Sequence, residues 1–155
     1  MEEDKINRRM LNYGFWLLGR KESSEKEITD KFKKKEYDEN EIKVVIDYLK
    51  EYNYINDIRF TEMFIRYGIN NKWGLGKIKQ KLSYDKGISS ETIQNVLEEM
   101  DIDESSSIEK LILTKYKRHD LKDPKAKQKV LSSLVSKGFK ISDIIKVITE
   151  INKAT

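Results

Sequence analysis

An internal repeat restricts the fold of this chain more than any other feature. Three segments each begin with a large apolar residue and carry Ile five positions later, at 37–42, 88–93 and 139–144, so that the copies start 51 residues apart. Four apolar residues then recur at the i, i+3, i+4, i+7 spacing that places one stripe along a helix. The three sets are Ile42, Val45, Ile46 and Leu49; Ile93, Val96, Leu97 and Met100; and Ile144, Val147, Ile148 and Ile151. Such a period predicts tandem supersecondary units.

Two more helical patterns precede each of these stripes. The nearer pattern is Ile28 with Phe32, Ile78 with Leu82, and Val130 with Leu134, and the farther one spans 6–17, 60–67 and 108–112. Three helices of about 12–14 residues with short loops fill one period. We therefore predict an all-α fold, an elongated array of three tandem three-helix repeats with nine helices and no sheet. The predicted repeats are residues 1–54, 55–102 and 103–155.

Polar residues and glycines mark the expected helix ends. Ser24 followed by Glu27 is a capping-box pattern. The other predicted end residues are Asp38; Asp57, expected to cap the helix that carries Phe60; Asp123 before Pro124; and the left-handed glycines Gly87 and Gly138. On the apolar stripes, Ile46, Leu97 and Ile148 occupy equivalent positions and should all be buried.

The composition excludes several classes of protein. With no Cys and a single His (His119), disulfide scaffolds, thiolate metal sites and mechanisms that need two imidazoles are ruled out. Although 37% of the residues are charged, the net charge is only +4 and 10% are aromatic, which favours a folded chain. No stretch is apolar enough for a membrane span, and the N-terminus (Met1 to Asp4) is acidic rather than signal-like, so we expect a soluble, cytoplasmic protein.

Three short motifs lack the residues that their chemistry would need. The segment 73–77 lacks the G-x-x-x-x-G-K-[ST] pattern of a nucleotide loop, and the acidic run 101–104 lacks the Gly and Glu of a calcium loop. His119 has no partner base or nucleophile. Trp16 and Trp73 are interpreted as packing residues rather than stacking platforms. We therefore expect no catalytic residue, no metal and no cofactor.

Charge alternates along the chain with the repeat. Residues 5–35, 67–90 and 111–140 carry net charges of +6, +4 and +7, whereas 36–66 and 91–110 carry −4 and −6. On the helix that turns Ile28 inward, Lys26, Lys33 and Lys34 fall on the outward arc and should be solvated. A solvated surface explains any one lysine, but three basic helices together suit a polyanionic or acidic partner.

A set of residues in a definite order runs from about residue 8 to 150. They are Tyr13, Leu17, Leu18, Arg20, Ser24, Glu27 and Ile28; Tyr54 through Phe60; Trp73, Gly74, Ile78, Leu82, Lys86, Gly87 and Ile88; and Lys137, Gly138 and Phe139. The most specific part is Arg20 with the following Ser-x-x-Glu segment, together with 57–60. In order and spacing these residues resemble the RecX family of bacterial regulators of the recombinase RecA.

The resemblance implies a non-enzymatic regulator that acts in DNA repair, homologous recombination and the SOS response. Family members are thought to lie in the groove of the RecA–single-strand DNA filament and to suppress filament growth, ATP hydrolysis, strand exchange and LexA cleavage. We expect a cytoplasmic monomer whose partners are RecA, the filament and, weakly, DNA itself. The candidate partner-binding residues are Arg20, Lys26, Lys33, Lys34, Arg59, Lys72, Lys77, Lys79, Lys81, Lys115, Lys117 and Arg118.

Two alternatives stay open at the level of sequence. One is a helical-repeat protein that binds nucleic acid directly through its basic stripe. The other is a helical adaptor for an unrelated protein. A direct nucleic-acid binder loses affinity steeply as salt rises and does not need RecA, whereas the adaptor ignores both RecA and DNA.

Overall fold

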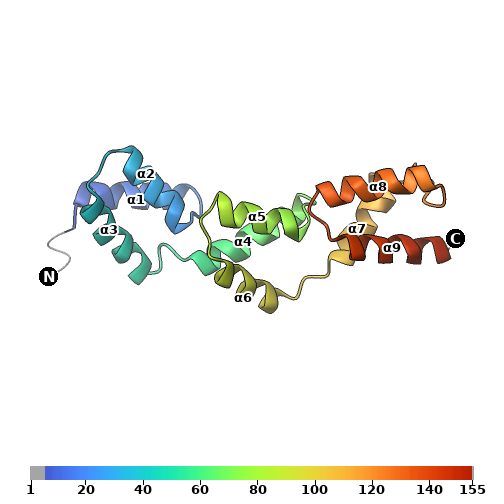
Figure 1. Ribbon diagram of the computed structural model, residues 1–155. Coiled ribbons are helices and arrows are strands. Elements are labelled where there is room, and N and C mark those ends of the chain that lie inside the picture. Colours follow the sequence, from blue (N-terminus) through green and yellow to red (C-terminus); the bar gives the residue numbers. More distant parts are fainter. Residues whose placement is uncertain (1–5, 155) are drawn as a thin grey trace. The chain divides into compact units, whose positions relative to one another are not determined.

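The structure is a computed structural model that describes residues 6–154, so the acidic segment Met1 to Asp4 lies outside the described residues. Over the described range it contains nine helices and no strand, which confirms the predicted all-α class (Figure 1). The helices are α1 (Arg8–Arg20), α2 (Glu25–Lys34), α3 (Glu39–Glu51), α4 (Asp57–Asn70), α5 (Leu75–Tyr84), α6 (Ser90–Met100), α7 (Glu104–Thr114), α8 (Pro124–Ser136) and α9 (Ile141–Ala154).

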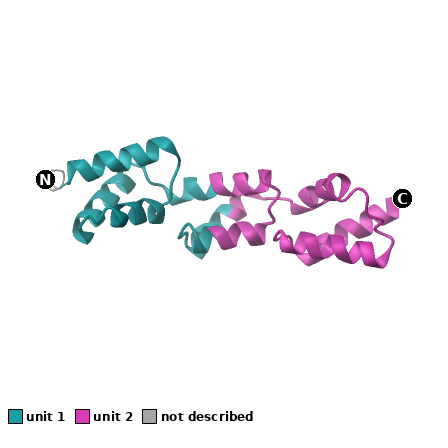
Figure 2. Ribbon diagram, turned by 90° about the horizontal axis from the view of Figure 1, so that it is seen from above, with its two compact units in different colours: residues 1–62, 82–96 teal, residues 63–81, 97–155 magenta. Residues whose placement is uncertain are grey.

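The chain divides into two compact units (Figure 2). Unit 1 comprises residues up to 62 with 82–96, and unit 2 comprises 63–81 with 97 onward. The division passes through α4, α5 and α6, so that each unit combines one terminal set of three helices with part of the expected middle repeat. The three predicted repeat boundaries and the elongation of the array stay predictions.

Each unit has an apolar core built from the predicted stripes. In unit 1, α2 packs against α1 and α3, and in unit 2, α7 and α8 pack against α9. The buried core of unit 1 contains Met10, Leu11, Ile28, Phe32, Ile42, Val45, Ile46, Leu49 and Ile55. That of unit 2 contains Ile108, Leu111, Ile112, Tyr116, Leu121, Val130, Leu134, Phe139, Ile144, Val147 and Ile148. The periodicity of the sequence therefore placed both cores correctly.

The expected burial of the three equivalent stripe residues holds for two of them. Ile46 and Ile148 are buried, but Leu97 is only half-buried, so the prediction is wrong at that position. The buried side of α6 is formed by Ile93 and Val96. Leu97, one residue further along, lies at the border of this buried face.

Most of the predicted helix caps are confirmed. Ser24 and Glu27 form a reciprocal capping box at the start of α2. Asp38 accepts hydrogen bonds from the backbone N–H groups of the first turn of α3, and Asp123 caps α8 with Pro at the first helical position. Each cap satisfies donors that a helix start leaves without an internal partner.

Asp57 has a different role from the predicted one. The α4 helix is capped by Asn56, whose side chain accepts from the N–H of Arg59. Asp57 Oδ1 instead accepts from the N–H of Glu25 at 2.9 Å, which caps α2 from 32 residues away. Burial raises the pKa of Asp57 and outweighs the opposing effect of this hydrogen bond. In unit 2, Glu104 at the start of α7 likewise accepts from a backbone N–H in the first turn of α5.

A glycine contact joins the start of α5 to the loop after α8 within unit 2. Gly138 has φ +97, the left-handed conformation that was predicted for it and for Gly87 (φ +68). The N–H of Gly74 donates to the carbonyl of Lys137 at 2.7 Å, and the N–H of Gly76 donates to that of Gly138 at 3.0 Å. A Cβ on Gly74 would lie under 3.0 Å from the backbone of Gly138, so the two segments meet backbone to backbone.

Candidate functional site

Lys26 lies outward on α2 as predicted, but its ammonium group already has a partner. It pairs with Asp30 at 2.8 Å, and its aliphatic stem lies against Gly87. Lys33 and Lys34 are also exposed on α2 and form no ion pair within residues 6–154. Among the three lysines predicted on the outward face, Lys33 and Lys34 therefore carry charges that no carboxylate balances in the described part of the chain.

Arg59 is engaged within unit 1 by three groups. Its Nε donates to the Glu22 carboxylate at 2.9 Å, and its two terminal nitrogens donate to the carbonyls of Asn53 at 3.0 Å and Tyr54 at 3.2 Å. A planar guanidinium that is held by a carboxylate and two carbonyls orients the turn before α4. Arg59 therefore has a structural role in the free protein.

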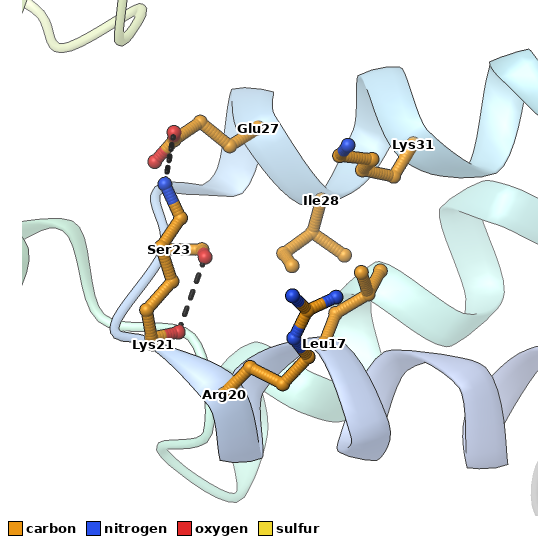
Figure 3. A pocket seen from close by; sticks show the side chains of 7 residues that line it. All are labelled: Leu17, Arg20, Lys21, Ser23, Glu27, Ile28 and Lys31. Atoms are coloured by element: carbon orange, nitrogen blue, oxygen red, sulfur yellow. Dashed lines mark hydrogen bonds and ion pairs between the residues drawn. The ribbon is translucent and has the colours of Figure 1, made fainter.

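Arg20 lines a pocket of about 270 Å³ between the end of α1 and the start of α2 (Figure 3). The lining residues are Leu17, Arg20, Lys21, Ser23, Glu27, Ile28 and Lys31. The Arg20 guanidinium lies 4.8 Å from the centre of the Trp16 ring, which stacks against Tyr13. Trp16 is 56% exposed, so it packs on Tyr13 and Arg20 at the surface and is not part of the core.

Glu27 is the carboxylate at the edge of this pocket. Its Oε2 lies 3.1 Å from the ammonium of Lys86 and 3.5 Å from that of Lys21. Burial alone would raise the pKa of Glu27. The hydrogen bond from the Ser24 backbone and the charges of Lys86 and Lys21 lower it by more, so that the pKa lies below its ordinary value. The group is thus a stable anion that pairs with two of the surrounding cations.

Trp73 is surrounded by cations in unit 2. The ammonium groups of Lys77 and Lys81 each lie 5.1 Å from the centre of its ring, within the range of a cation–π contact. The Tyr67 ring meets Trp73 edge to face, with the centroids 5.6 Å apart. Trp73 is half-buried, in line with its interpretation as a packing residue, but it also fixes two of the predicted partner-binding lysines.

Lys137 lies beside the predicted partner-binding residues Lys77 and Lys115, but it was not itself among the residues predicted from the sequence. Its side chain approaches that of Lys115, and burial together with the charges of Lys115 and Lys77 lowers its pKa. The signal was present in the repeat, because Lys137 precedes Gly138 as Lys86 precedes Gly87, 51 residues earlier.

The remaining predicted residues of unit 2 are exposed. They are Lys72 in the loop after α4, Lys79 on α5, and Lys117 and Arg118 in the loop after α7. In the turn after α7, Tyr116 is buried and its hydroxyl bonds to that of Ser133 on α8. Lys115 and Lys117, which flank Tyr116 in the sequence, are exposed on either side of this buried residue.

Neither a metal-ligand group nor a membrane-spanning helix occurs within residues 6–154. No group of three or more His, Asp or Glu side chains in that range is arranged to hold a metal ion. None of the helices in the same range combines the length and the apolar character that crossing a bilayer requires.

The chain matches two family models in tandem. Residues 11–49 match the first three-helix domain of RecX, and residues 56–97 match the second. The chain belongs to the RecX family. The two matches correspond to α1 through α3 and to α4 through α6, respectively.

Individual members of the RecX family match nearly the whole chain. A protein named "Regulatory protein RecX" from Haemophilus influenzae is 33% identical over 138 residues, which cover 88% of this chain and 91% of that protein. Its namesake from Clostridioides difficile is 37% identical over 147 residues, covering 93% and 68%. The crystal structure of RecX from Lactobacillus salivarius superimposes with a TM-score of 0.82 at 24% identity, covering 94% of this chain and 96% of that one.

Proposed function

We propose that this protein is a non-enzymatic, cytoplasmic regulator of the recombinase RecA. It binds in the groove of the RecA–single-strand DNA filament as a monomer and suppresses filament growth, ATP hydrolysis, strand exchange and LexA cleavage, and so acts in recombination, DNA repair and the SOS response. The observation that carries the proposal is its match to proteins named "Regulatory protein RecX" over 88% of the chain.

The distribution of charge supports a surface that meets an acidic or phosphate-bearing partner. On α2, Lys33 and Lys34 are exposed and unbalanced, while the neighbouring Lys26 is balanced by Asp30. Exposed lysines of this kind keep their charge available and contribute little to stability. They are therefore stronger candidates for partner contact than Lys26 or Arg59.

The direct test adds the purified protein to RecA filaments preformed on single-stranded DNA and follows ATP hydrolysis. We expect hydrolysis to fall at or below one protein molecule per RecA protomer, and we expect the protein alone to hydrolyse neither ATP nor DNA. Undiminished hydrolysis would contradict the proposal. So would an intrinsic ATPase or nuclease activity that a point mutation in this chain abolishes.

A double variant tests the α2 surface. Lys33→Glu/Lys34→Glu should lower the free energy of unfolding by about 0.3–1 kcal/mol per residue, because both exposed side chains lie in the last turn of α2, where a cation is favoured over an anion. The same change should weaken inhibition of the RecA ATPase, most strongly at low salt, because exposed charges are screened as ionic strength rises. The measurement pairs thermal melting with ATPase inhibition at several salt concentrations.

The matched control is Arg8→Glu/Arg9→Glu, which reverses two adjacent exposed charges of the same unit on α1. If both double variants lose inhibition equally, net charge rather than the α2 surface governs binding. If neither loses inhibition while both melt normally, Lys33 and Lys34 only solvate the surface.

Direct binding of nucleic acid is the second candidate. The observation that favours it is the placement of Lys77 and Lys81 around Trp73, a combination of cations and an aromatic ring typical of proteins that bind single strands. Binding to an oligonucleotide without RecA, with a steep dependence on salt, would distinguish it from a regulator that needs the filament. A helical adaptor for an unrelated protein would respond to neither RecA nor oligonucleotide.

A further inference from the structure

The α2 and α5 helices can be compared residue by residue, because Ile28 and Phe32 of the first correspond to Ile78 and Leu82 of the second. The third residue is Glu27 in α2 and Lys77 in α5. In each unit, a loop that contains a left-handed glycine lies against the start of one of these helices. The loop of Gly87 lies against α2, and the loop of Gly138 lies against α5.

The residue before each of these glycines is a lysine, Lys86 in unit 1 and Lys137 in unit 2. In unit 1 the facing charges are opposite, since Lys86 pairs with Glu27 at 3.1 Å. In unit 2 the corresponding position holds Lys77, so that a lysine faces a lysine. The charge at the third position of the helix is thus negative in α2 and positive in α5, although the two positions are equivalent.

The backbone keeps these two lysines close together. The carbonyl of Lys137 accepts from Gly74, and a Cβ on Gly138 would lie 2.7 Å from the Cβ of Lys77. The side chain of Lys115, at the end of α7, approaches Lys137 as well. None of these three lysines forms an ion pair within residues 6–154. Three ammonium groups are therefore gathered without a carboxylate of the described chain to balance them.

Lys77 also opposes the local electrostatics of its helix. It stands at the third position of α5, in the first turn, where the helix dipole carries partial positive charge and acidic residues are favoured. Glu27 follows that rule in α2. Like charges placed together against a helix start destabilise the free protein, and a local conflict of this kind is typical of a functional site.

We propose that Lys77, Lys115 and Lys137 bind a phosphate group in the backbone of single-stranded nucleic acid. A phosphodiester carries the negative charge that the cluster lacks, and its oxygens can accept hydrogen bonds from several ammonium groups. The neighbouring aromatic residues favour a single strand over an acidic protein segment. Lys77 also contacts Trp73, and Tyr67 beside it is 51% exposed, which leaves a ring face on which an unpaired base can stack.

This inference rests on the second candidate function, direct contact with nucleic acid. The test contains no RecA, so the result does not depend on whether the protein inhibits the recombinase. The probe is a thymidine oligonucleotide, and the readout is tryptophan fluorescence. A Trp16→Phe background leaves Trp73 as the sole tryptophan of the chain. Its fluorescence should be quenched when the strand binds beside Lys77.

The decisive variant is Lys77→Glu, which recreates in unit 2 the Glu–Lys pairing of unit 1. Oligonucleotide affinity should fall at least about tenfold, and the slope of log affinity against log salt should become shallower by about 0.7 for each phosphate that the variant no longer neutralises. The melting temperature should be unchanged or higher, because the variant gains an ion pair and an acidic residue at the helix start. A loss of binding with undiminished stability excludes misfolding as the cause.

The matched control is Lys146→Glu, which makes the same change of charge at an exposed position of α9 in the same unit. Its affinity should fall much less. Equal losses in both variants, or no loss in Lys77→Glu, would overturn the site. A polyglutamate that competes as well as the oligonucleotide would overturn the assignment to phosphate. A duplex of the same sequence bound as tightly would overturn the preference for a single strand.

Discussion

Ile148→Ala should lower the free energy of unfolding by about 2–5 kcal/mol. Ile148 has no exposed surface and lies in the core of unit 2, where α9 meets α7 and α8. Removing three carbon atoms there loses the transfer free energy of the side chain and leaves a cavity that the surrounding helices fill only in part. Urea denaturation followed by circular dichroism measures the change.

The matched control is Leu97→Ala at the equivalent position of the middle stripe. Because Leu97 is half-buried, solvent already reaches part of its side chain, and the loss should be clearly smaller than at Ile148. Equal losses at the two positions would mean that the burial difference between them does not exist in solution.

Gly74→Ala should lower the free energy of unfolding by about 3 kcal/mol or more, at the upper end of the range for overpacking. The new methyl group would lie under 3.0 Å from the backbone atoms of Gly138 and Phe139. No side-chain rotation can relieve a clash with backbone, so the segments must separate. Separation would break the hydrogen bond from Gly74 to the carbonyl of Lys137.

The control is Gly19→Ala in α1, where a Cβ would meet no atom within 4 Å. Ala is a better helix former than Gly, so this variant should gain up to about 1 kcal/mol. Thermal melting of both variants under one condition gives the comparison. A neutral Gly74→Ala would show that the close approach of the two loops is not a feature of the folded protein.

The helices and their buried faces followed directly from the sequence. The recurrence of Ile42, Val45, Ile46 and Leu49 in two later stripes defines an apolar face for each helix, and helical periodicity is a local property that a chain expresses wherever the segment lies. The caps at Ser24, Asp38 and Asp123 were equally accessible, because each acts on N–H groups within three residues of its own position. Local spacing was sufficient for these features.

The partners of the individual charged side chains were decided by the tertiary structure. Asp57 caps a helix that begins 32 residues earlier, and Arg59 is held by Glu22 from another segment. Lys137 acquires Lys77 as a neighbour because the Gly74 and Gly138 loops meet. No local pattern encodes such pairings, since they depend on which distant segments pack together. The sequence by itself determined which face of each helix is apolar. The contacts between distant segments decided which basic residues are balanced within the described chain and which carry an unbalanced charge.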